Sequence, residues 1–272
     1  MNVTKRSITI NGKRILVREC IPDETAPGVT SDADAPFLLL IHGNTASGLW
    51  FEGAMPLLRA RTIAADLPNF GGSESIDESD IDVYADYVAK TVEAEFNGHK
   101  FFLAGHSLGG AVAMSLAIRM PQRIRGLILV DSCAPSGLAT PEAYYPIIEQ
   151  YKTNRELLRG ALASVTPKLD DEDFLDLLVT EALRMSPEAF VGNARALTRF
   201  NCTGRTSLVE APVLVIRGSD DLLITAEMAR ETAAAFRTAR LEEVAGIGHS
   251  IVVEDPKGFA RLVNRFVLQN GG

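Results

Sequence analysis

The residues with the clearest chemical potential lie at Gly105-His106-Ser107-Leu108-Gly109, where a serine has a glycine two positions away on each side. An apolar run, 101–104, precedes this segment, and a helical pattern follows it. A sharp turn between a buried strand and a helix holds a serine in a strained backbone conformation, and side chains two residues away would collide with it. The turn also brings the hydroxyl to the N-terminus of the helix, whose free N–H groups favour developing negative charge. The pattern therefore predicts that Ser107 is a nucleophile.

A serine hydroxyl needs a base that accepts its proton, and the chain offers four histidines. His42 directly follows an apolar run, His99 lies in a polar turn, and His106 lies inside the serine segment itself. His249 lies in a glycine-containing loop just after the last predicted strand, where the sites of open α/β sheets form. We therefore predict that His249 is the base.

A carboxylate is needed to hold the imidazole in the correct tautomer and to stabilise the imidazolium. The segment Gly218-Ser219-Asp220-Asp221 follows the penultimate predicted strand and lies between the serine and the histidine in the chain, as required. We predict Asp221 as this acid and Asp220 as a solvated or loop-capping neighbour. Asp131, at the end of the predicted strand after the serine helix, is the alternative acid.

The oxyanion of an acyl-transfer reaction requires two positioned N–H donors. One is predicted at the backbone N–H of Leu108, directly after the nucleophile. The other is expected in the loop 42–45 after the apolar run 37–41, where a glycine permits close approach. The backbone N–H of Asn44 is the preferred donor there, and Thr45 is the alternative.

The elements that position these residues are short apolar runs alternating with helical patterns. Predicted strands cover 37–41, 61–65, 101–104, 127–130, 213–216 and 241–244, and predicted helices begin near Ile81, Leu108, Thr225 and Pro256. This alternation predicts an α/β fold with a mostly parallel central sheet and helices on both faces. Asn11-Gly12 predicts a hairpin between 7–10 and 14–18, and Ser79 is predicted to be the N-cap of the first helix.

The alternation stops between Cys133 and Pro212. Only helical patterns occur there, at 141–152, 155–164, 171–184 and 187–200. We therefore predict an all-helical insertion at 137–206, within a core formed by 1–136 and 207–272.

The composition narrows the classes of molecule that the protein is expected to bind. The 272 residues carry a net charge of −8 without a Lys/Arg run, which disfavours nucleic acids and anionic membranes. Cys20, Cys133 and Cys202 are widely spaced and odd in number, which predicts reduced thiols. The N-terminal residues lack the apolar stretch of a signal peptide, and 22–36 is expected to be a polar surface connection. We expect a cytoplasmic monomer or homodimer that acts on a small molecule.

Taken together, the motifs carry a family resemblance. They occur in the order HGN, DLPNFGGS, GHSLGG, VLVIRGSDD and GIGHS, with Glu254-Asp255-Pro256 after the last. Over essentially the whole chain this set resembles the capped α/β-hydrolases, which include esterases, lactonases, carbon–carbon bond hydrolases, haloalkane dehalogenases and epoxide hydrolases. The resemblance implies the α/β-hydrolase fold, with the helical insertion as a lid over the site.

Departures from the family patterns narrow the chemistry further. Haloalkane dehalogenases and epoxide hydrolases carry an aspartate where this chain has Ser107, and Leu108 stands where dehalogenases have a tryptophan. The loop HGNTASG is less glycine-rich than is usual for carbon–carbon hydrolases. Asn69 replaces the glycine usual in the DLPGFG-type turn, and we interpret Asp66 and that turn as structural.

The sequence thus predicts a serine hydrolase that cleaves a small or medium, mostly apolar carboxylic ester or lactone through an acyl-enzyme on Ser107. This chemistry needs no metal or organic cofactor. The residues that we expect as candidates for lining the substrate pocket are Trp50, Phe51, Tyr144 and Phe174. Two alternatives stay open: the same triad acting on a thioester, amide or carbon–carbon bond, or a ligand-binding receptor with slow turnover.

Overall fold

The central feature of the computed structural model, which describes residues 2–22 and 35–271, is one sheet with the strand order β1-β2-β4-β3-β5-β6-β7-β8. The strands are β1 Thr4–Ile10, β2 Lys13–Cys20, β3 Phe37–Ile41, β4 Arg61–Ala65, β5 Phe101–His106, β6 Ile124–Val130, β7 Val213–Gly218 and β8 Ala239–Val244. From β4 to β8 all neighbouring strands are parallel, and β1 and β2 add an antiparallel edge. The predicted α/β class is confirmed. The predicted connection 22–36 lies almost entirely outside the described residues.

The antiparallel edge is the predicted hairpin. Ile10 pairs with Lys13 across a two-residue turn. Asn11 (φ 52°) and Gly12 (φ 75°) both have left-handed backbones. This is the geometry of the tight turn that matches strand twist, and it is the reason for the Asn-Gly pair.

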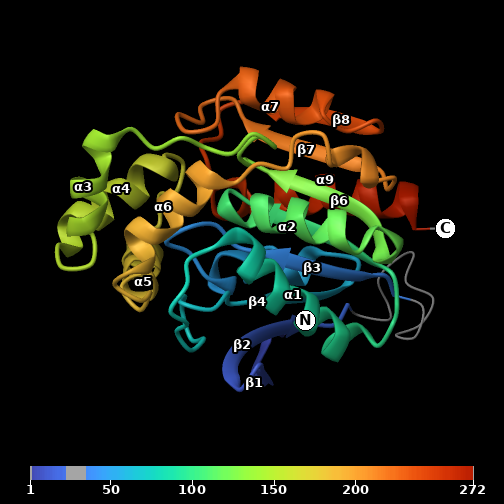
Figure 1. The fold of residues 1–272 in the computed structure, drawn as a ribbon, viewed down its shortest axis with the longest axis horizontal. Coiled ribbons are helices and arrows are strands. Elements are labelled where there is room, and N and C mark those ends of the chain that lie inside the picture. Colours follow the sequence, from blue (N-terminus) through green and yellow to red (C-terminus); the bar gives the residue numbers. More distant parts are fainter. Residues whose placement is uncertain (1, 23–34, 272) are drawn as a thin grey trace.

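Helices cover both faces of the sheet (Figure 1). α1 (Ile81–Phe96) and α2 (Leu108–Arg119) lie on one face, and α9 (Pro256–Asn270) lies on the other. α7 (Ala226–Ala234) joins β7 to β8, and the short α8 (Ile251–Glu254) precedes α9. Among the described residues, no helix is both long and apolar enough to cross a membrane.

The start of α1 differs from the prediction. The N-cap is Asp80, not Ser79, because the Asp80 carboxylate accepts the N–H groups of Asp82 at 2.8 Å and Val83 at 3.3 Å. Two neighbouring polar residues can each fulfil this role, and only the backbone geometry decides between them.

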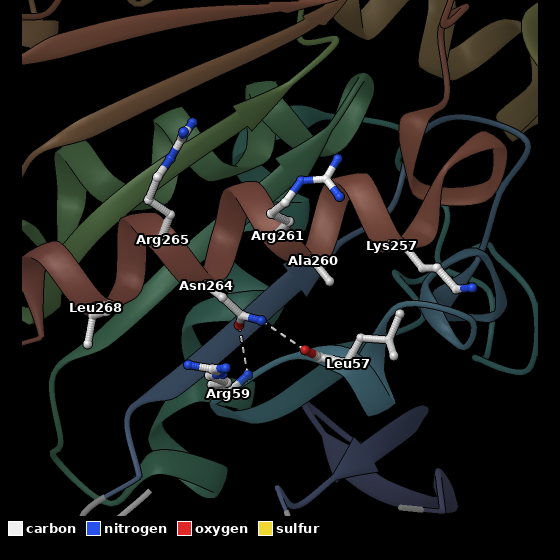
Figure 2. Close-up of a pocket in the computed structure, with 8 residues that line it drawn as sticks. All are labelled: Leu57, Arg59, Lys257, Ala260, Arg261, Asn264, Arg265 and Leu268. Atoms are coloured by element: carbon white, nitrogen blue, oxygen red, sulfur yellow. Dashed lines mark hydrogen bonds between the residues drawn. The ribbon is translucent and has the colours of Figure 1, made fainter. Parts of the chain in front are cut away.

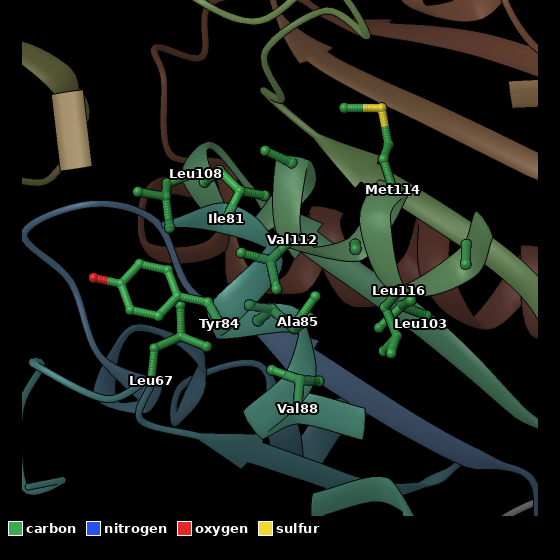
Figure 3. Close-up of a cluster of buried hydrophobic side chains, with 14 of the residues drawn as sticks. Leu67, Ile81, Tyr84, Ala85, Val88, Leu103, Leu108, Val112, Met114 and Leu116 are labelled. Atoms are coloured by element: carbon green, nitrogen blue, oxygen red, sulfur yellow. The ribbon is translucent and has the colours of Figure 1, made fainter. Parts of the chain in front are cut away.

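Two apolar cores lie on opposite faces of the sheet because side chains alternate along each strand. In β3, Leu39 and Ile41 belong to one core, while Leu38 and Leu40 belong to the other. Figure 3 shows the first core where α1 meets α2, with Tyr84 at its edge. Burying one such leucine contributes on the order of 1.5–3 kcal/mol.

Helices occupy the chain between β6 and β7, and we call residues 137–206 the inserted segment. It contains α3 (Tyr145–Gln150), α4 (Arg155–Val165), α5 (Glu172–Ala182) and α6 (Ala189–Arg199), with a single 3₁₀ turn at Glu142–Tyr144. A second 3₁₀ turn, Thr206–Leu208, begins at its last residue. Asn154 and Asp171 are N-caps, whose side chains accept N–H groups at the start of α4 and α5. Figure 1 shows these helices gathered at one end of the sheet.

A buried arginine links the inserted segment to the sheet. Arg18 of β2 donates to Asp66 at 2.5 Å and to Glu52 at 2.7 Å, and it lies 3.4 Å from Glu181 of α5. Glu181 also accepts the hydroxyl of Ser47 at 3.1 Å. Buried carboxylates require such partners, since an unpaired buried charge is strongly destabilising.

Asp66 also organises the turn after β4, in agreement with its structural interpretation. Its two carboxylate oxygens accept the backbone N–H groups of Gly48 and Gly72, each at 2.8 Å. In the same turn, Asn69 has φ 76°, in the left-handed region where asparagine is the usual substitute for glycine. The loop after β3 and the turn after β4 are therefore held together by one carboxylate.

Candidate active site

Ser107 sits in the strained turn that its flanking glycines predicted. Its backbone has φ 52° and ψ −118°, between the end of β5 and the start of α2. A Cβ on Gly105 would lie 2.2 Å from the carbonyl oxygen of Gly109. A Cβ on Gly109 would lie 2.3 Å from the carbonyl oxygen of Ile41. Glycine is therefore required at both positions, and the strain is confined to the serine.

The structure brings Ser107, His249 and Asp221 into one hydrogen-bonded line. His249 Nε2 lies 2.8 Å from Ser107 Oγ, and His249 Nδ1 lies 2.8 Å from Asp221 Oδ2. The side chains of the histidine and the aspartate are almost fully buried. Ser107 directly follows β5, and Asp221 and His249 lie in the loops that follow β7 and β8. All three residues therefore lie beyond the C-terminal ends of parallel strands.

The aspartate is held in its ionised form. Burial alone would raise the pKa of Asp221, but the hydrogen bond and charge of His249 hold that pKa below its usual value. The N–H groups of Leu223 (2.7 Å) and Ile224 (3.0 Å), which donate to Asp221 Oδ1, act in the same direction. An ionised Asp221 accepts the Nδ1 proton of His249, so Nε2 is free to accept the proton of Ser107.

Asp131, the alternative acid, lies beside Asp221 but has a different environment. Its Oδ1 accepts the N–H of Gly218 at 2.8 Å, and its buried Oδ2 has no hydrogen-bond partner among the described residues. Burial and the charge of Asp221 raise the pKa of Asp131 well above its usual value. A neutral carboxyl there fits beside the ionised Asp221, which is the acid that contacts His249.

We predict that Asp131→Asn stabilises the protein increasingly as pH rises. In the folded protein the pKa of Asp131 is raised. The stability that this side chain contributes is therefore complete below about pH 3.8, its pKa in the unfolded chain, and is lost as pH rises through its pKa in the folded protein. Asparagine keeps an acceptor for Gly218 and cannot ionise. The gain in unfolding free energy should be larger at about pH 8 than at about pH 4, with a slope of at most ~1.4 kcal/mol per pH unit. Urea unfolding at both pH values measures it, and a pH-independent difference would contradict the prediction.

The other buried histidines already have partners. His42 Nδ1 donates to the carbonyl of Gly43 at 2.8 Å, and His42 Nε2 accepts the N–H of Leu67 at 2.9 Å. His106 Nε2 donates to the backbone carbonyl of His249 at 2.8 Å. Burial lowers the pKa of His106 to about 3, so this side chain is neutral. His106 therefore supports the backbone of His249, a contact that the sequence did not reveal.

Glu254 holds the loop that carries His249 from the other side. Its carboxylate accepts the N–H groups of Gly248 and Ser250, the two neighbours of His249, each at 3.0 Å. It also accepts the N–H of Lys168 in the inserted segment at 3.2 Å. The sequence offered one signal for this role, the motif Glu254-Asp255-Pro256 shortly after the histidine.

We predict that Glu254→Ala lowers kcat by roughly 10- to 100-fold, because small displacements of a catalytic group have effects of this order. The apparent KM should change much less, since Glu254 lies behind His249 rather than at a substrate contact. Steady-state ester hydrolysis measures both constants. Glu227→Ala, on the exposed start of α7, is the matched control. Equal kcat values for the two variants would argue against a positioning role.

The loop after β3 packs directly against the serine turn. A Cβ on Gly43 would lie 2.9 Å from His106 Nδ1 and 3.0 Å from Ser107 Cβ. The next residue is Asn44, and neither its backbone N–H nor that of Leu108 has an acceptor among the described residues. Leu108 is the first residue of α2, so its N–H lacks an intrahelical partner. Both predicted oxyanion donors therefore lack a partner within the part of the chain that the structure describes.

The four residues expected to line the pocket lie in different environments. Trp50 is buried and stacks on His106, with ring centroids 5.8 Å apart. Phe51 packs against Phe259 in the core on the α9 face. Phe174 is half-buried, whereas Tyr144 is 56% exposed. Among these four residues, Trp50 is the one whose aromatic contact, with His106, leads to a residue beside His249.

An open hollow of about 450 Å³ lies elsewhere, on α9 (Figure 2). Its lining residues are Leu57, Arg59, Lys257, Ala260, Arg261, Asn264, Arg265 and Leu268. None of these side chains is a serine, a histidine or a carboxylate, so this hollow lacks the groups of the serine line. The described residues contain no group of three or more potential metal ligands, and the three cysteines are buried and free.

Comparison with known proteins agrees with this fold. The family model described as alpha/beta hydrolase family matches residues 38–262. The pimeloyl-[acyl-carrier protein] methyl ester esterase of Neisseria meningitidis serogroup B is 28% identical over 244 residues, which are 84% of this chain and 91% of that protein. The polyketide synthase ThaQ of Burkholderia thailandensis is 24% identical over 85% of this chain, which spans 12% of that protein. The enol-lactonase of Burkholderia xenovorans has a similar structure, with a TM-score of 0.80, 20% identity and coverage of 97% of this chain and 100% of that one.

Proposed function

The chain belongs to the alpha/beta hydrolase family, and on that premise we propose that it is a serine hydrolase for a small or medium, mostly apolar carboxylic ester or lactone. The observation that carries the proposal is the line Asp221–His249–Ser107, with 2.8 Å at both contacts. A binding protein requires neither this line nor the strained serine turn. The names of the esterase and enol-lactonase relatives support the choice of ester bonds.

In the proposed mechanism, Ser107 Oγ attacks the substrate carbonyl while His249 Nε2 accepts its proton. Asp221 stabilises the imidazolium through Nδ1. The tetrahedral oxyanion is bound by the backbone N–H groups of Asn44 and Leu108, each worth roughly 3–4 kcal/mol in the transition state. His249 then protonates the leaving alkoxide, and the same histidine activates the water that cleaves the acyl-enzyme.

We also propose that the inserted segment is the lid of this site. Asn193 of α6 donates to the side chain of Asn44 at 2.9 Å, and the backbone of Lys168 donates to Glu254. The segment therefore contacts both the oxyanion loop and the carboxylate that holds the histidine loop. Differences in the substrate's leaving group and acyl chain would be recognised by side chains of this segment.

The test is a substrate panel: p-nitrophenyl esters of increasing acyl length, an aliphatic lactone, an aryl thioester and an anilide. Ester or lactone hydrolysis with a pre-steady-state burst supports an acyl-enzyme, and the optimum acyl length measures the pocket. A preference for the thioester or the anilide would replace the ester assignment. A folded protein that hydrolyses none of them, yet gains thermal stability from a bound ester, would indicate a receptor.

A further inference from the structure

We infer that Asn193, a residue of the inserted segment, is a positioning residue for the oxyanion loop: it fixes the orientation of the Asn44 side-chain amide. The inference rests on the proposed hydrolase function and adds residues to its site. It follows from a chain of hydrogen bonds in which donors and acceptors can be assigned one after another. That chain runs from the turn after β4, through Tyr84 of α1 and Asn193 of α6, to Asn44.

The chain begins at Asn69, whose amide orientation is fixed by two backbone groups. The N–H of Ile76 donates to Asn69 Oδ1 at 2.8 Å, so this atom must be the oxygen. Asn69 Nδ2 donates to the carbonyl of Glu78 at 3.1 Å, so that atom must be the nitrogen. The same nitrogen donates to the hydroxyl of Tyr84 at 3.3 Å.

The second link is Tyr84, which is fully buried at the edge of the core (Figure 3). Burial raises the pKa of Tyr84, so its hydroxyl keeps its proton. Since the hydroxyl accepts from Asn69, its own proton is available for Asn193 Oδ1, which lies 2.8 Å away. Tyr84 thereby transmits the orientation of one amide to the next.

The third link is Asn193, which is also fully buried. Its nitrogen lies 3.8 Å from the thioether sulfur of Met185, an atom that can only accept. This contact and the one with Tyr84 assign the same orientation independently. Asn193 Nδ2 must therefore donate to Asn44 Oδ1, at 2.9 Å.

The consequence is that Asn44 directs its carbonyl oxygen toward Asn193 of the inserted segment, and we infer that its NH₂ group is thereby left for the site. The hydrogen bond to Asn193 is the one that the Asn44 side chain makes within the described residues, and Asn44 is only partly buried. An amide turned the other way would place a negative oxygen dipole where the reaction develops an oxyanion. The orientation depends on a donor from the inserted segment, which couples the position of the lid to the chemistry of the loop.

The experiment compares kcat and KM for the best p-nitrophenyl ester in native protein, Asn193→Ala and Thr198→Ala. Thr198 lies on the same helix, and its side-chain hydrogen bonds to described residues all stay within the inserted segment, so it is the matched control for the stability of that segment. We expect Asn193→Ala to lower kcat by roughly 10- to 100-fold with a smaller change in KM. Thr198→Ala should leave kcat near the native value. In an Asn44→Ala background, Asn193→Ala should cause no further loss, because it acts through that amide.

A second readout does not depend on turnover. In isotope-labelled protein, the side-chain amide NMR signals of Asn44, assigned by their loss in Asn44→Ala, should shift in Asn193→Ala and Tyr84→Phe but not in Thr198→Ala. Unshifted signals, or a full additional loss of kcat in the Asn44→Ala background, would overturn the inference. A native protein that hydrolyses no ester but shows the expected shifts would instead refute the proposed function and leave the hydrogen-bond chain established.

Discussion

Replacing Ser107 with alanine is expected to lower kcat for ester hydrolysis by roughly 10⁵- to 10⁶-fold, because it removes the only atom that can form the acyl-enzyme. Folding should be unaffected, since alanine and serine have similar backbone preferences at the strained φ of 52°. The pre-steady-state burst with a p-nitrophenyl ester should disappear as well. Stopped-flow absorbance for the burst and long incubations for the residual rate measure both effects.

The control for this variant is Ser250→Ala. Ser250 is adjacent to His249 and fully buried, and its hydroxyl has no hydrogen-bond partner among the described residues. Its loss should leave kcat within severalfold of the native value and should not reduce stability, because burying an unpaired hydroxyl is unfavourable. A large loss in Ser250→Ala together with a small one in Ser107→Ala would mean that the nucleophile has been assigned wrongly.

Replacing Asp221 with asparagine is expected to lower kcat by roughly 10⁴-fold, because an amide no longer stabilises the tautomer that leaves His249 Nε2 free to accept the serine proton. The matched change Asp131→Asn replaces a neighbouring buried carboxyl with the same amide. Asp131 has no hydrogen bond to His249 among the described residues. The kcat of the Asp131→Asn variant should therefore stay within severalfold of the native value.

The pair of variants separates the two acids. Initial rates at neutral pH, with circular dichroism to verify folding, are sufficient. If Asp131→Asn were the damaging change and Asp221→Asn the mild one, the acid would come from the end of β6. Comparable losses would indicate that the two carboxyls function as one coupled unit, and the assignment of Asp221 alone would be wrong.

Much of the site could be predicted because each of its main residues carries a local signal. The glycines around Ser107 reflect contacts within one turn. Asp221 follows the buried strand β7 and His249 follows the edge strand β8, and the C-terminal ends of these two neighbours meet in the parallel sheet. Strand and helix patterns likewise depend on residues only a few positions apart, so the fold class followed from them.

The supporting contacts could not be predicted, because they join residues far apart in the chain. Asn193 and Asn44 are 149 positions apart, and the periodicity of α6 indicates that Asn193 is buried without indicating what it meets. The bond from His106 to the carbonyl of His249 spans 143 positions. Each depends on how the inserted segment or a loop packs against the sheet, which is a property of the tertiary structure.

The cluster around Arg18 has a consequence for exchanging parts between related enzymes. Glu181 comes from α5, yet it completes a charge group that otherwise belongs to the sheet, 3.4 Å from Arg18 and 3.1 Å from the hydroxyl of Ser47. A chimera that receives a foreign helical segment without a carboxylate at this position would leave the buried arginine with one partner fewer. Because Arg18 keeps Asp66 and Glu52, the cost should lie below the about 3–5 kcal/mol of an uncompensated buried charge. The helical insertion is therefore not an interchangeable module. A transplanted segment has to bring its own acid, because a neutral residue at position 18 would leave the buried Asp66 without its charged partner.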